Sequence, residues 1–386
     1  MLRLVSLILV SLLLLAGCGG SEPESSSRSA PETPAATESE APPSSPDATG
    51  SPSAASSAPP SGTAASARPR VIGTVASNLE VPWGIAFLPD GSALVTERDS
   101  GRVLQVTGRS VREVGVVEEA QPDGEAGLLG VAVSPSYAQD QRVFLYATTD
   151  SDNRVLRTTL RNGRLGRLEP ILTDIPRAGN HDGGRMIFGP DGHLYVATGE
   201  AGQPDLAQDR DSLGGKILRI TPDGDPAPGN PDRQSPVWTW GHRNVQGLAF
   251  DADGNLWASE FGQNSFDELN LIRKGRNYGW PMVEGKGDEG GLTNPQVTWS
   301  TDEASPSGLA FVAGRLWLGA LRGERLWRVD VNGGKATAEK GFFVGEYGRV
   351  RTVVPTPDGN LWVTTSNRDG RGDPAAKDDR ILLVRP

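Results

Sequence analysis

The sequence predicts an all-β protein, a six-bladed β-propeller. The main observation is a repeated hairpin pattern, in which a polar segment leads into a short apolar strand, a tight turn and a second apolar strand. Asp-Gly pairs in these turns tolerate positive φ, which lets two successive strands fold back on each other. The copies recur about every 45–60 residues, the range of propeller blades. No convincing amphipathic helix interrupts them.

The pattern is clearest in residues 241–262, GHRNVQGLAFDADGNLWASEFG, and five further copies span 81–97, 127–148, 183–200, 307–323 and 352–367. Each hairpin is followed by a third strand-like segment, at 102–106, 154–160, 216–220, 268–272, 325–329 and 380–384. Six hairpins and six third strands supply the inner strands of six blades. Residues 71–76 are a candidate to close the ring against the last blade, because a propeller leaves only short, protected edges.

The first 17 residues predict an export signal. Residues 5–16 are apolar and too short to span a bilayer. Leu15-Ala16-Gly17-Cys18 resembles the cleavage box of bacterial lipoproteins, in which the cysteine is lipidated and becomes the new N-terminus. Cys18 is the only cysteine in the chain, so no disulfide framework exists. We expect an exported protein that is lipid-anchored at the extracytoplasmic face of the membrane; an ordinary signal peptide with a chance cysteine is the alternative.

Residues 18–67, which follow the signal, are rich in Ser, Pro, Ala, Thr and Glu and contain almost no large apolar side chain. Such a segment cannot bury enough surface to offset chain entropy, so it predicts a disordered tether. Residues 68–386 are the expected folded domain, and one domain is preferred although the length allows two. The net charge of −10 indicates no nucleic-acid partner.

The hairpin geometry predicts where a functional site lies. The start of the first strand and the end of the second strand lie at one end of a hairpin, so equivalent positions in six blades gather on one face around one axis. The strand starts bring Trp83, Glu125, Asn180, His181, Arg185, Arg243, Asn244, Ser305, Arg349 and Arg351, and the strand ends bring Glu97, Glu200, Glu260, Gly262, Gln263, Arg322, Asn367 and Arg368. Arginines present paired donors for carboxylate or phosphate. Pairing of each arginine with a neighbouring acid is the alternative.

Two further patterns leave their interpretation open at this point. His181 begins a blade among glycines, where a neutral imidazole is a candidate general base and a structural role is equally compatible. Residues 261–268, FGQNSFDE, offer backbone carbonyls and acids of the kind that calcium prefers, or a solvated loop. Zinc spacing, a P-loop, a Rossmann fingerprint and a haem CxxCH are absent from the sequence.

Several long segments are similar to the pyrroloquinoline-quinone-dependent soluble glucose and aldose sugar dehydrogenases. These segments are GNHDGGRMIFGPDGHLYVATGE (179–200), GHRNVQGLAFDADGNLWASEFGQNSFDELNLIRKGRNYGWP (241–281), SGLAF (307–311) and TTSNRDGRGDP (364–374). The similarity covers nearly all of residues 70–386. It implies a six-bladed propeller that binds the quinone and calcium and oxidises the anomeric hydroxyl of an aldose sugar to a lactone. An external electron acceptor is expected, because no haem motif is present.

The resemblance also assigns roles residue by residue. It places the base on His181 and the quinone-contacting Arg-Asn pair on Arg243 and Asn244, with Arg243 taking part in the chemistry. Its late cofactor arginines match Arg349 and Arg351. The calcium ligands are the backbone carbonyls of Gly262 and Gln263, and the acidic and tyrosine ligands fall on Glu268 and Tyr278.

The chain departs from the glucose enzymes at three positions, and this places it closer to the aldose sugar dehydrogenases. A cofactor lysine is replaced near Arg322, a glutamine near the cofactor is Glu125, and the acid before the histidine is Asn180. Sugar choice stays open. Two other classes also remain: a metal-dependent six-bladed lactonase with a side-chain-ligated ion on its axis, and a non-catalytic surface binding module.

Overall fold

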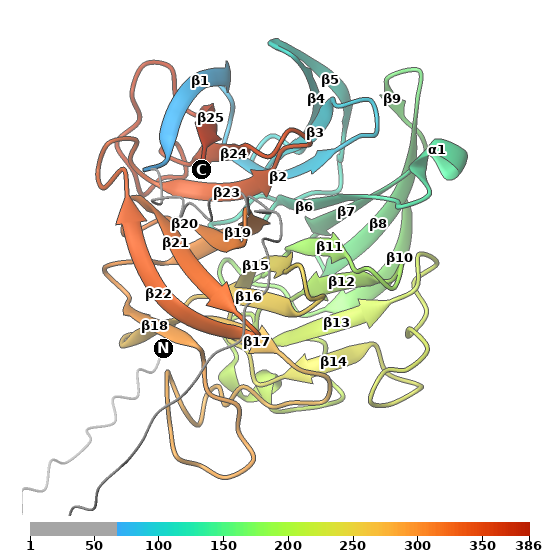
Figure 1. The fold of residues 1–386 in the computed structure, drawn as a ribbon. Helices are drawn as coiled ribbons and strands as arrows, with labels where there is room; N and C mark the ends of the chain where they lie inside the picture. The colour runs from blue at the N-terminus through green and yellow to red at the C-terminus, as the bar shows by residue number, and fades with distance from the viewer. Residues whose placement is uncertain (1–67) are drawn as a thin grey trace, which may run out of the picture. The chain divides into compact units, whose positions relative to one another are not determined.

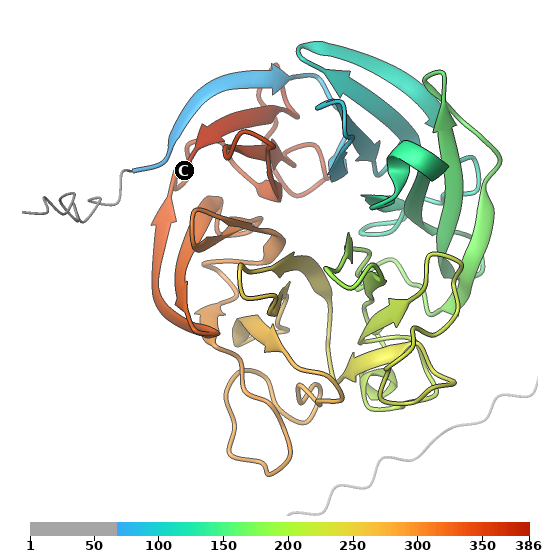
Figure 2. The same cartoon turned by 45° about the vertical axis from the view of Figure 1, so that its right-hand side comes forward.

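The computed structural model describes residues 68–386, whose strands form six antiparallel sheets. The sheets follow one another around a common axis as the blades of a propeller (Figure 1, Figure 2). The six-bladed β-propeller expected from the repeat is therefore confirmed. Cys18, the predicted signal and the predicted tether lie outside the described residues. Within residues 68–386, no helix has the length and apolar character needed to cross a membrane.

Each blade consists of consecutive strands, except the sixth. Blade 1 contains β2 (Pro82–Phe87), β3 (Ala93–Glu97), β4 (Arg102–Thr107) and β5 (Ser110–Val116). Blade 2 contains β6 (Leu128–Val133), β7 (Arg142–Thr148), β8 (Asn153–Arg161) and β10 (Glu169–Ile175), with the short β9 (Arg164–Leu165) paired to β8 and the one-turn helix α1 (Tyr137–Asp140) before β7. Blade 3 contains β11 (Met186–Phe188), β12 (Leu194–Ala197), β13 (Lys216–Ile220) and β14 (Val237–Trp240), with the 3₁₀ turn η1 (Pro204–Ala207) before β13.

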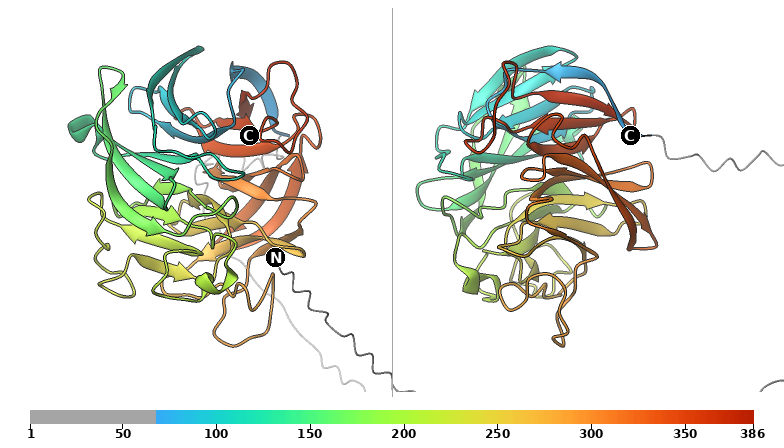
Figure 3. Two further views of the ribbon diagram at one scale, coloured as in Figure 1. Left: turned by 180° about the vertical axis from the view of Figure 1, so that it is seen from behind. Right: turned by 90° about the vertical axis from the view of Figure 1, so that its left-hand side faces the viewer.

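The remaining blades follow the same order. Blade 4 contains β15 (Val245–Phe250), β16 (Leu256–Glu260), β17 (Phe266–Ile272) and β18 (Val297–Ser300). Blade 5 contains β19 (Pro306–Val312), β20 (Arg315–Ala320), β21 (Arg325–Asn332) and β22 (Lys335–Phe342). Blade 6 contains β23 (Val350–Pro355), β24 (Leu361–Thr365), β25 (Ile381–Arg385) and β1 (Arg70–Ala76). The connection between β17 and β18 extends outward beyond the blades (Figure 3).

The ring closes through strands from the two ends of the described chain. β1 pairs antiparallel with β25, so that Val71 lies opposite Val384 and Ala76 opposite Ile381. The segment expected to close the ring therefore does so. Pairing within one sheet satisfies the backbone groups of both terminal strands and leaves no long open edge.

The repeated turn is held by its first aspartate. In blade 4, Asp251 Oδ1 accepts the backbone N–H groups of Asp253 and Asn255, and Asp251 Oδ2 accepts the Trp257 indole N–H at 2.8 Å. Gly254 adopts φ of 78°, the left-handed conformation that glycine tolerates best. The turn therefore fixes the hairpin register and anchors a fully buried tryptophan of the second strand.

The glycine in the repeated QGLAF and SGLAF segments has a packing reason near the axis. A Cβ on Gly247 would lie 2.3 Å from the Ser307 carbonyl oxygen, and one on Gly308 would lie 2.6 Å from the Val353 nitrogen. The innermost strands of neighbouring blades therefore approach each other closely only because these positions lack a side chain. This close approach brings the ends of those strands together on one face.

Candidate active site

A cavity of about 370 Å³ opens where strand ends of several blades converge. It is rich in arginine and contains two acids. The lining residues are Arg98, Glu125, Gln246, Phe261, Ser305, Leu321, Arg322, Arg349, Arg351, Asp369 and Arg371. The structure thus brings together Glu125, Arg322, Arg349 and Arg351, which the sequence assigned to one face. Sequence reasoning missed the contribution of Arg98, Gln246, Asp369 and Arg371.

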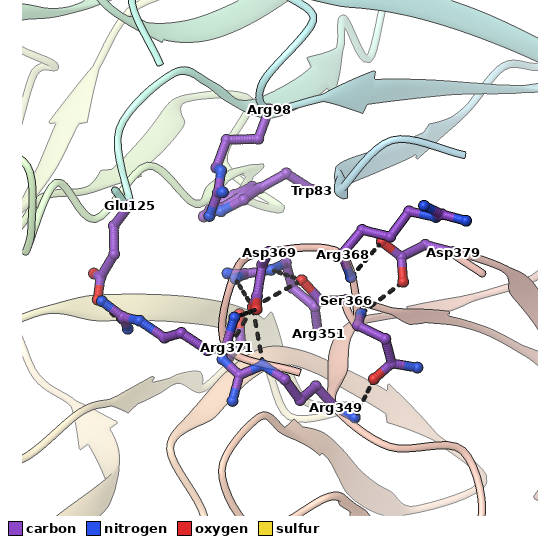
Figure 4. A network of polar contacts seen from close by, with 12 residues as sticks. Trp83, Arg98, Glu125, Arg349, Arg351, Ser366, Arg368, Asp369, Arg371 and Asp379 are labelled. Atoms are coloured by element: carbon purple, nitrogen blue, oxygen red, sulfur yellow. Dashed lines mark hydrogen bonds and ion pairs between the residues drawn. The ribbon is translucent and has the colours of Figure 1, made fainter. Parts of the chain in front are cut away.

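The charges of this cavity are only partly balanced. Arg349 and Arg351 share one buried carboxylate, Asp369, with N–O distances of 2.9 and 3.3 Å (Figure 4). Burial raises the pKa of Asp369, but the two guanidinium groups outweigh it and hold the pKa below its ordinary value. Two cations therefore face one anion, and the pair retains excess positive charge.

The alternative in which each arginine is neutralised by its own acid holds for three of the lining residues. Arg98 pairs with Asp99, Arg322 with Asp302 at 2.6 Å, and Arg371 with Glu125 at 3.1 Å. The Arg322 side chain is also 63% exposed, so it lies at the rim of the cavity. Local pairing therefore explains these rim arginines and leaves the Arg349–Arg351 pair unexplained.

Arg243 lies next to the cavity without a partner acid at ion-pair distance among residues 68–386. Its Nη1 donates to the carbonyl oxygen of Phe261 at 3.3 Å, its guanidinium lies 5.4 Å from the Trp280 ring centre, and its buried Nε has no hydrogen-bond partner. Burial lowers the pKa of Arg243 below its ordinary value. An unsatisfied buried donor costs stability unless something binds to it, so Arg243 indicates a binding site for an anionic or oxygen-rich molecule.

His181 is held in a constrained conformation by two acids. Its Nδ1 lies 2.8 Å from Glu200 Oε1, and its backbone N–H donates to Glu125 Oε2 at 3.3 Å. Its φ is 58°, which is uncommon for a residue other than glycine. Because a carboxylate only accepts, the proton lies on Nδ1, and Nε2 keeps its lone pair with the Asn180 amide nitrogen 3.3 Å away. This arrangement suits a general base at Nε2, and Glu200 is the functional partner that sequence reasoning did not identify.

Glu125 connects several predicted residues. Its Oε2 also accepts the side-chain amide of Asn244 at 3.1 Å, and Asn244 Oδ1 accepts the Gly183 N–H at 3.1 Å. Burial raises the pKa of Glu125, but the charges of Arg371 and His181 lower it further, so the pKa lies below its ordinary value. Asn244 is fully buried with both ends of its amide engaged. In this structure Asn244 therefore supports the wall of the site, and its contact with a cofactor stays a prediction.

The loop that carries Gly262 and Gln263 wraps around an acid. Glu284 Oε1 accepts four consecutive backbone N–H groups, those of residues 263–266, at 2.7–3.1 Å. Burial raises the pKa of Glu284, but these donors outweigh it, so the pKa lies below its ordinary value. The carbonyls of Gly262 and Gln263 accept no backbone hydrogen bond within residues 68–386. Two backbone oxygens are therefore available on a loop of fixed shape.

Glu268 and Tyr278 lie differently. Burial and the nearby charge of Glu260 raise the pKa of Glu268 to about 8, and its two oxygens accept from Gly285 N–H and the Asn270 amide. The Tyr278 hydroxyl donates to the Leu271 carbonyl and accepts the Arg273 N–H, both at 2.8 Å, at the end of β17 away from Gly262. The structure therefore does not offer the hydroxyl as a metal ligand with Gly262, and only the Tyr278 carbonyl remains for that predicted role. No group of three or more His, Cys, Asp or Glu side chains in the described part of the chain is arranged as a metal site.

The fold and site together define a propeller enzyme with a histidine–carboxylate pair beside a cationic cavity. A model of the glucose/sorbosone dehydrogenase family matches residues 79–383, so the chain belongs to this family of oxidoreductases. Aldose sugar dehydrogenase YliI of Escherichia coli is 31% identical over 336 residues, which is 78% of this chain and 91% of that protein.

Two solved structures extend the similarity. The PQQ-bound form of aldose sugar dehydrogenase from Streptomyces coelicolor is 51% identical, covers 82% of this chain and 98% of its own, and has a TM-score of 0.81. The putative glucose dehydrogenase of Thermus thermophilus is 42% identical, covers 82% of this chain and 100% of its own, and has a TM-score of 0.78. The family expected from the sequence motifs is therefore confirmed.

Proposed function

We propose that this chain oxidises aldose sugars at the anomeric hydroxyl to lactones, with pyrroloquinoline quinone and calcium as cofactors and an external electron acceptor. The observation that carries the proposal is the His181–Glu200 pair, in which Nε2 keeps a lone pair beside a cationic cavity. The PQQ-bound aldose sugar dehydrogenase of Streptomyces coelicolor supports the choice of quinone.

The residues fit a quinone with three carboxylates. Arg349 and Arg351 share one acid, so they have charge left for an anionic ligand. Arg243 has a buried unpartnered Nε and an aromatic neighbour, Trp280. Guanidinium groups bind carboxylates through paired donors, and their pairing with a ligand in a water-poor cavity is stronger than at the surface. These three arginines are the proposed quinone contacts, with Arg322 at the rim.

The residues also fit calcium, with a smaller donor set than the sequence implied. Calcium prefers oxygen ligands and accepts backbone carbonyls. The carbonyls of Gly262 and Gln263 are on a loop whose shape Glu284 fixes through four N–H groups. The rest of the coordination would come from the quinone and water. Glu268 and the Tyr278 carbonyl stay separate candidate ligands.

The mechanism can be derived from the chain's own groups. His181 Nε2 accepts the proton of the anomeric hydroxyl, and Glu200 stabilises the resulting imidazolium through Nδ1–H. Glu125 and the φ of 58° hold the His181 backbone, so the ring does not swing away from the sugar. Arg243 supplies a positive charge beside the cavity. The chemistry that the bound quinone and calcium supply is hydride acceptance and Lewis-acid polarisation of the reactive carbonyl.

Reconstitution tests the proposal directly. The purified protein should reduce a dye in the presence of an aldose only after both quinone and calcium are added, and a chelator present during reconstitution should prevent this. A panel of aldoses would then identify the sugar. Activity with a nicotinamide cofactor, or no activity with quinone and calcium, would reject the assignment.

The two other classes are less compatible with the structure. A propeller lactonase needs a side-chain-ligated ion on its axis, but here the Arg185 guanidinium reaches across the centre to residues of blades 1, 4 and 6. A non-catalytic binding module would not need the strained His181 conformation or its pairing with Glu200. Lipid anchoring through Cys18 remains a separate proposal, supported by the cleavage-box sequence.

A further inference from the structure

Arg185 is a buried cation at the centre of the ring. It precedes β11 in blade 3, and only 8% of its surface is exposed. Its Nε donates to the Gln246 carbonyl at 2.8 Å, its Nη2 to Thr352 Oγ1 at 3.2 Å, and its Nη1 lies 3.5 Å from the Trp83 carbonyl. The guanidinium also lies 4.2 Å from the centre of the Trp83 ring.

All of these partners are uncharged. No acid within residues 68–386 lies at ion-pair distance from Arg185. Burial, followed by the charge of Arg351, lowers the pKa of Arg185 to about 9, which still leaves it charged at neutral pH. A buried charge without a counter-charge is costly, and hydrogen bonds to neutral groups offset only part of that cost. The native protein therefore keeps a positive charge that its own residues do not neutralise.

This charge lies directly behind the quinone cavity. Gln246 lines the cavity, and its side-chain oxygen accepts from Arg351 at 3.3 Å while its backbone oxygen accepts from Arg185. One residue therefore separates Arg185 from a proposed quinone contact. Trp83 and Arg351 mark this side of the cavity in Figure 4.

The opposite side of Arg185 offers no counter-charge either. A second cavity, of about 350 Å³, has Arg185 as its only charged lining residue, and the innermost strands line it with side chains such as Ile85, Leu248 and Val353. The field of the guanidinium is therefore not balanced by an acid from either face.

We propose that Arg185 raises the reduction potential of the bound quinone from behind the site, through its charge and without touching the cofactor. This inference rests on the proposed function. A fixed positive charge in a low-dielectric interior stabilises the more electron-rich, reduced form of a nearby cofactor more than the oxidised form. Arg185 is thus a tuning residue, distinct from the arginines that hold the cofactor.

The experiment is a redox titration of the reconstituted full chain. Arg185→Met and Arg185→Gln remove the charge, and Gln retains an N–H donor for Gln246. At a fixed electrode potential we expect the ratio of reduced to oxidised quinone to fall about tenfold in both, which equals about 30 mV for a two-electron couple. Arg185→Lys, which keeps the charge, should change the ratio less than threefold.

The matched control is Arg219→Met. Arg219 is equally buried but neutralised by Asp191 at 2.7 Å and does not line the quinone cavity, so the ratio should stay unchanged. Ratios within twofold of wild type in the neutral Arg185 variants would overturn the proposal. Loss of folding in both would also overturn it, because Arg185 would then serve the stability of the core. If the wild type shows no quinone redox signal, the proposed function itself fails.

Discussion

His181 Nδ1 lies 2.8 Å from Glu200 Oε1, although the two residues begin and end different strands of the same blade. The contact fixes which ring nitrogen carries the proton. It also makes Glu200 a partner of the base that can be tested separately from the base itself.

The first prediction compares these two residues. His181→Gln should lower kcat by about 10²–10⁴-fold, the usual contribution of a positioned general base. Glu200→Gln should lower it less, by about 10–100-fold, because the ring stays in place while the amide can favour the wrong tautomer. Steady-state kinetics measure both, and quinone absorption should show unchanged loading. Near-normal turnover of His181→Gln would return this histidine to a structural role.

The second prediction concerns Glu284 and calcium. Glu284→Gln removes the charge that holds four N–H groups of the 263–266 loop. The calcium concentration for half-maximal reconstitution should therefore rise by about tenfold, roughly 1.4 kcal/mol of binding free energy. Asp288→Asn removes an exposed acid from the same connection and is the control. Equal effects of the two variants would contradict a specific role for Glu284.

The third prediction is a pH dependence of stability. Burial raises the pKa of Asp182 to about 7, and its Oδ2 has no hydrogen-bond partner. Between about pH 4 and pH 7 the folded state therefore binds more protons than the unfolded state, so stability falls as the pH rises through this range. Asp182→Asn keeps an acceptor for Asn153 and Ala178 and should remove this fall.

The measurement is urea unfolding of the cofactor-free protein at pH 4.5 and pH 8. The variant should gain stability relative to wild type on going to pH 8, by up to about 4 kcal/mol at 1.36 kcal/mol per pH unit. Asp253→Asn, at an exposed turn, should show no such gain. A wild type whose stability does not fall over this range would contradict the raised pKa of Asp182.

The fourth prediction concerns the Arg371–Glu125 ion pair, which joins blade 6 to the connection before blade 2 along one side of the cavity. Arg371 is 59% exposed, so Arg371→Ala should cost at most about 1 kcal/mol of stability. Removal of this side chain should widen the cavity and raise kcat/KM for a disaccharide relative to a monosaccharide by about tenfold. Arg164→Ala, an exposed arginine away from the cavity, should leave the ratio unchanged.

The fifth prediction tests the proposed anchor. Cys18→Ser should block lipidation and either release the protein from the membrane fraction or stop its processing. Fractionation followed by intact-mass measurement distinguishes these outcomes. A variant that is processed normally and stays in the membrane fraction would contradict the lipoprotein assignment.

The sequence by itself determined the six blades, the closing strand and the face on which the site lies. These follow from local physics: apolar periodicity defines the strands, Asp-Gly turns define the hairpins, and their repetition brings equivalent positions together. The convergence of Glu125, Arg349 and Arg351 at one cavity needed no further information. The family motifs singled out His181 in the same way.

Only the tertiary structure decided which charges meet. Arg371 reaches Glu125 across 246 residues, Arg349 and Arg351 share Asp369, and Arg185 crosses the centre to Thr352 without an acid. Local pattern cannot determine such pairs, because long side chains from irregular connections find partners according to the three-dimensional distance between blades. The same reason explains Tyr278, whose hydroxyl closes the end of β17 and does not face the loop to which the motif assigned it.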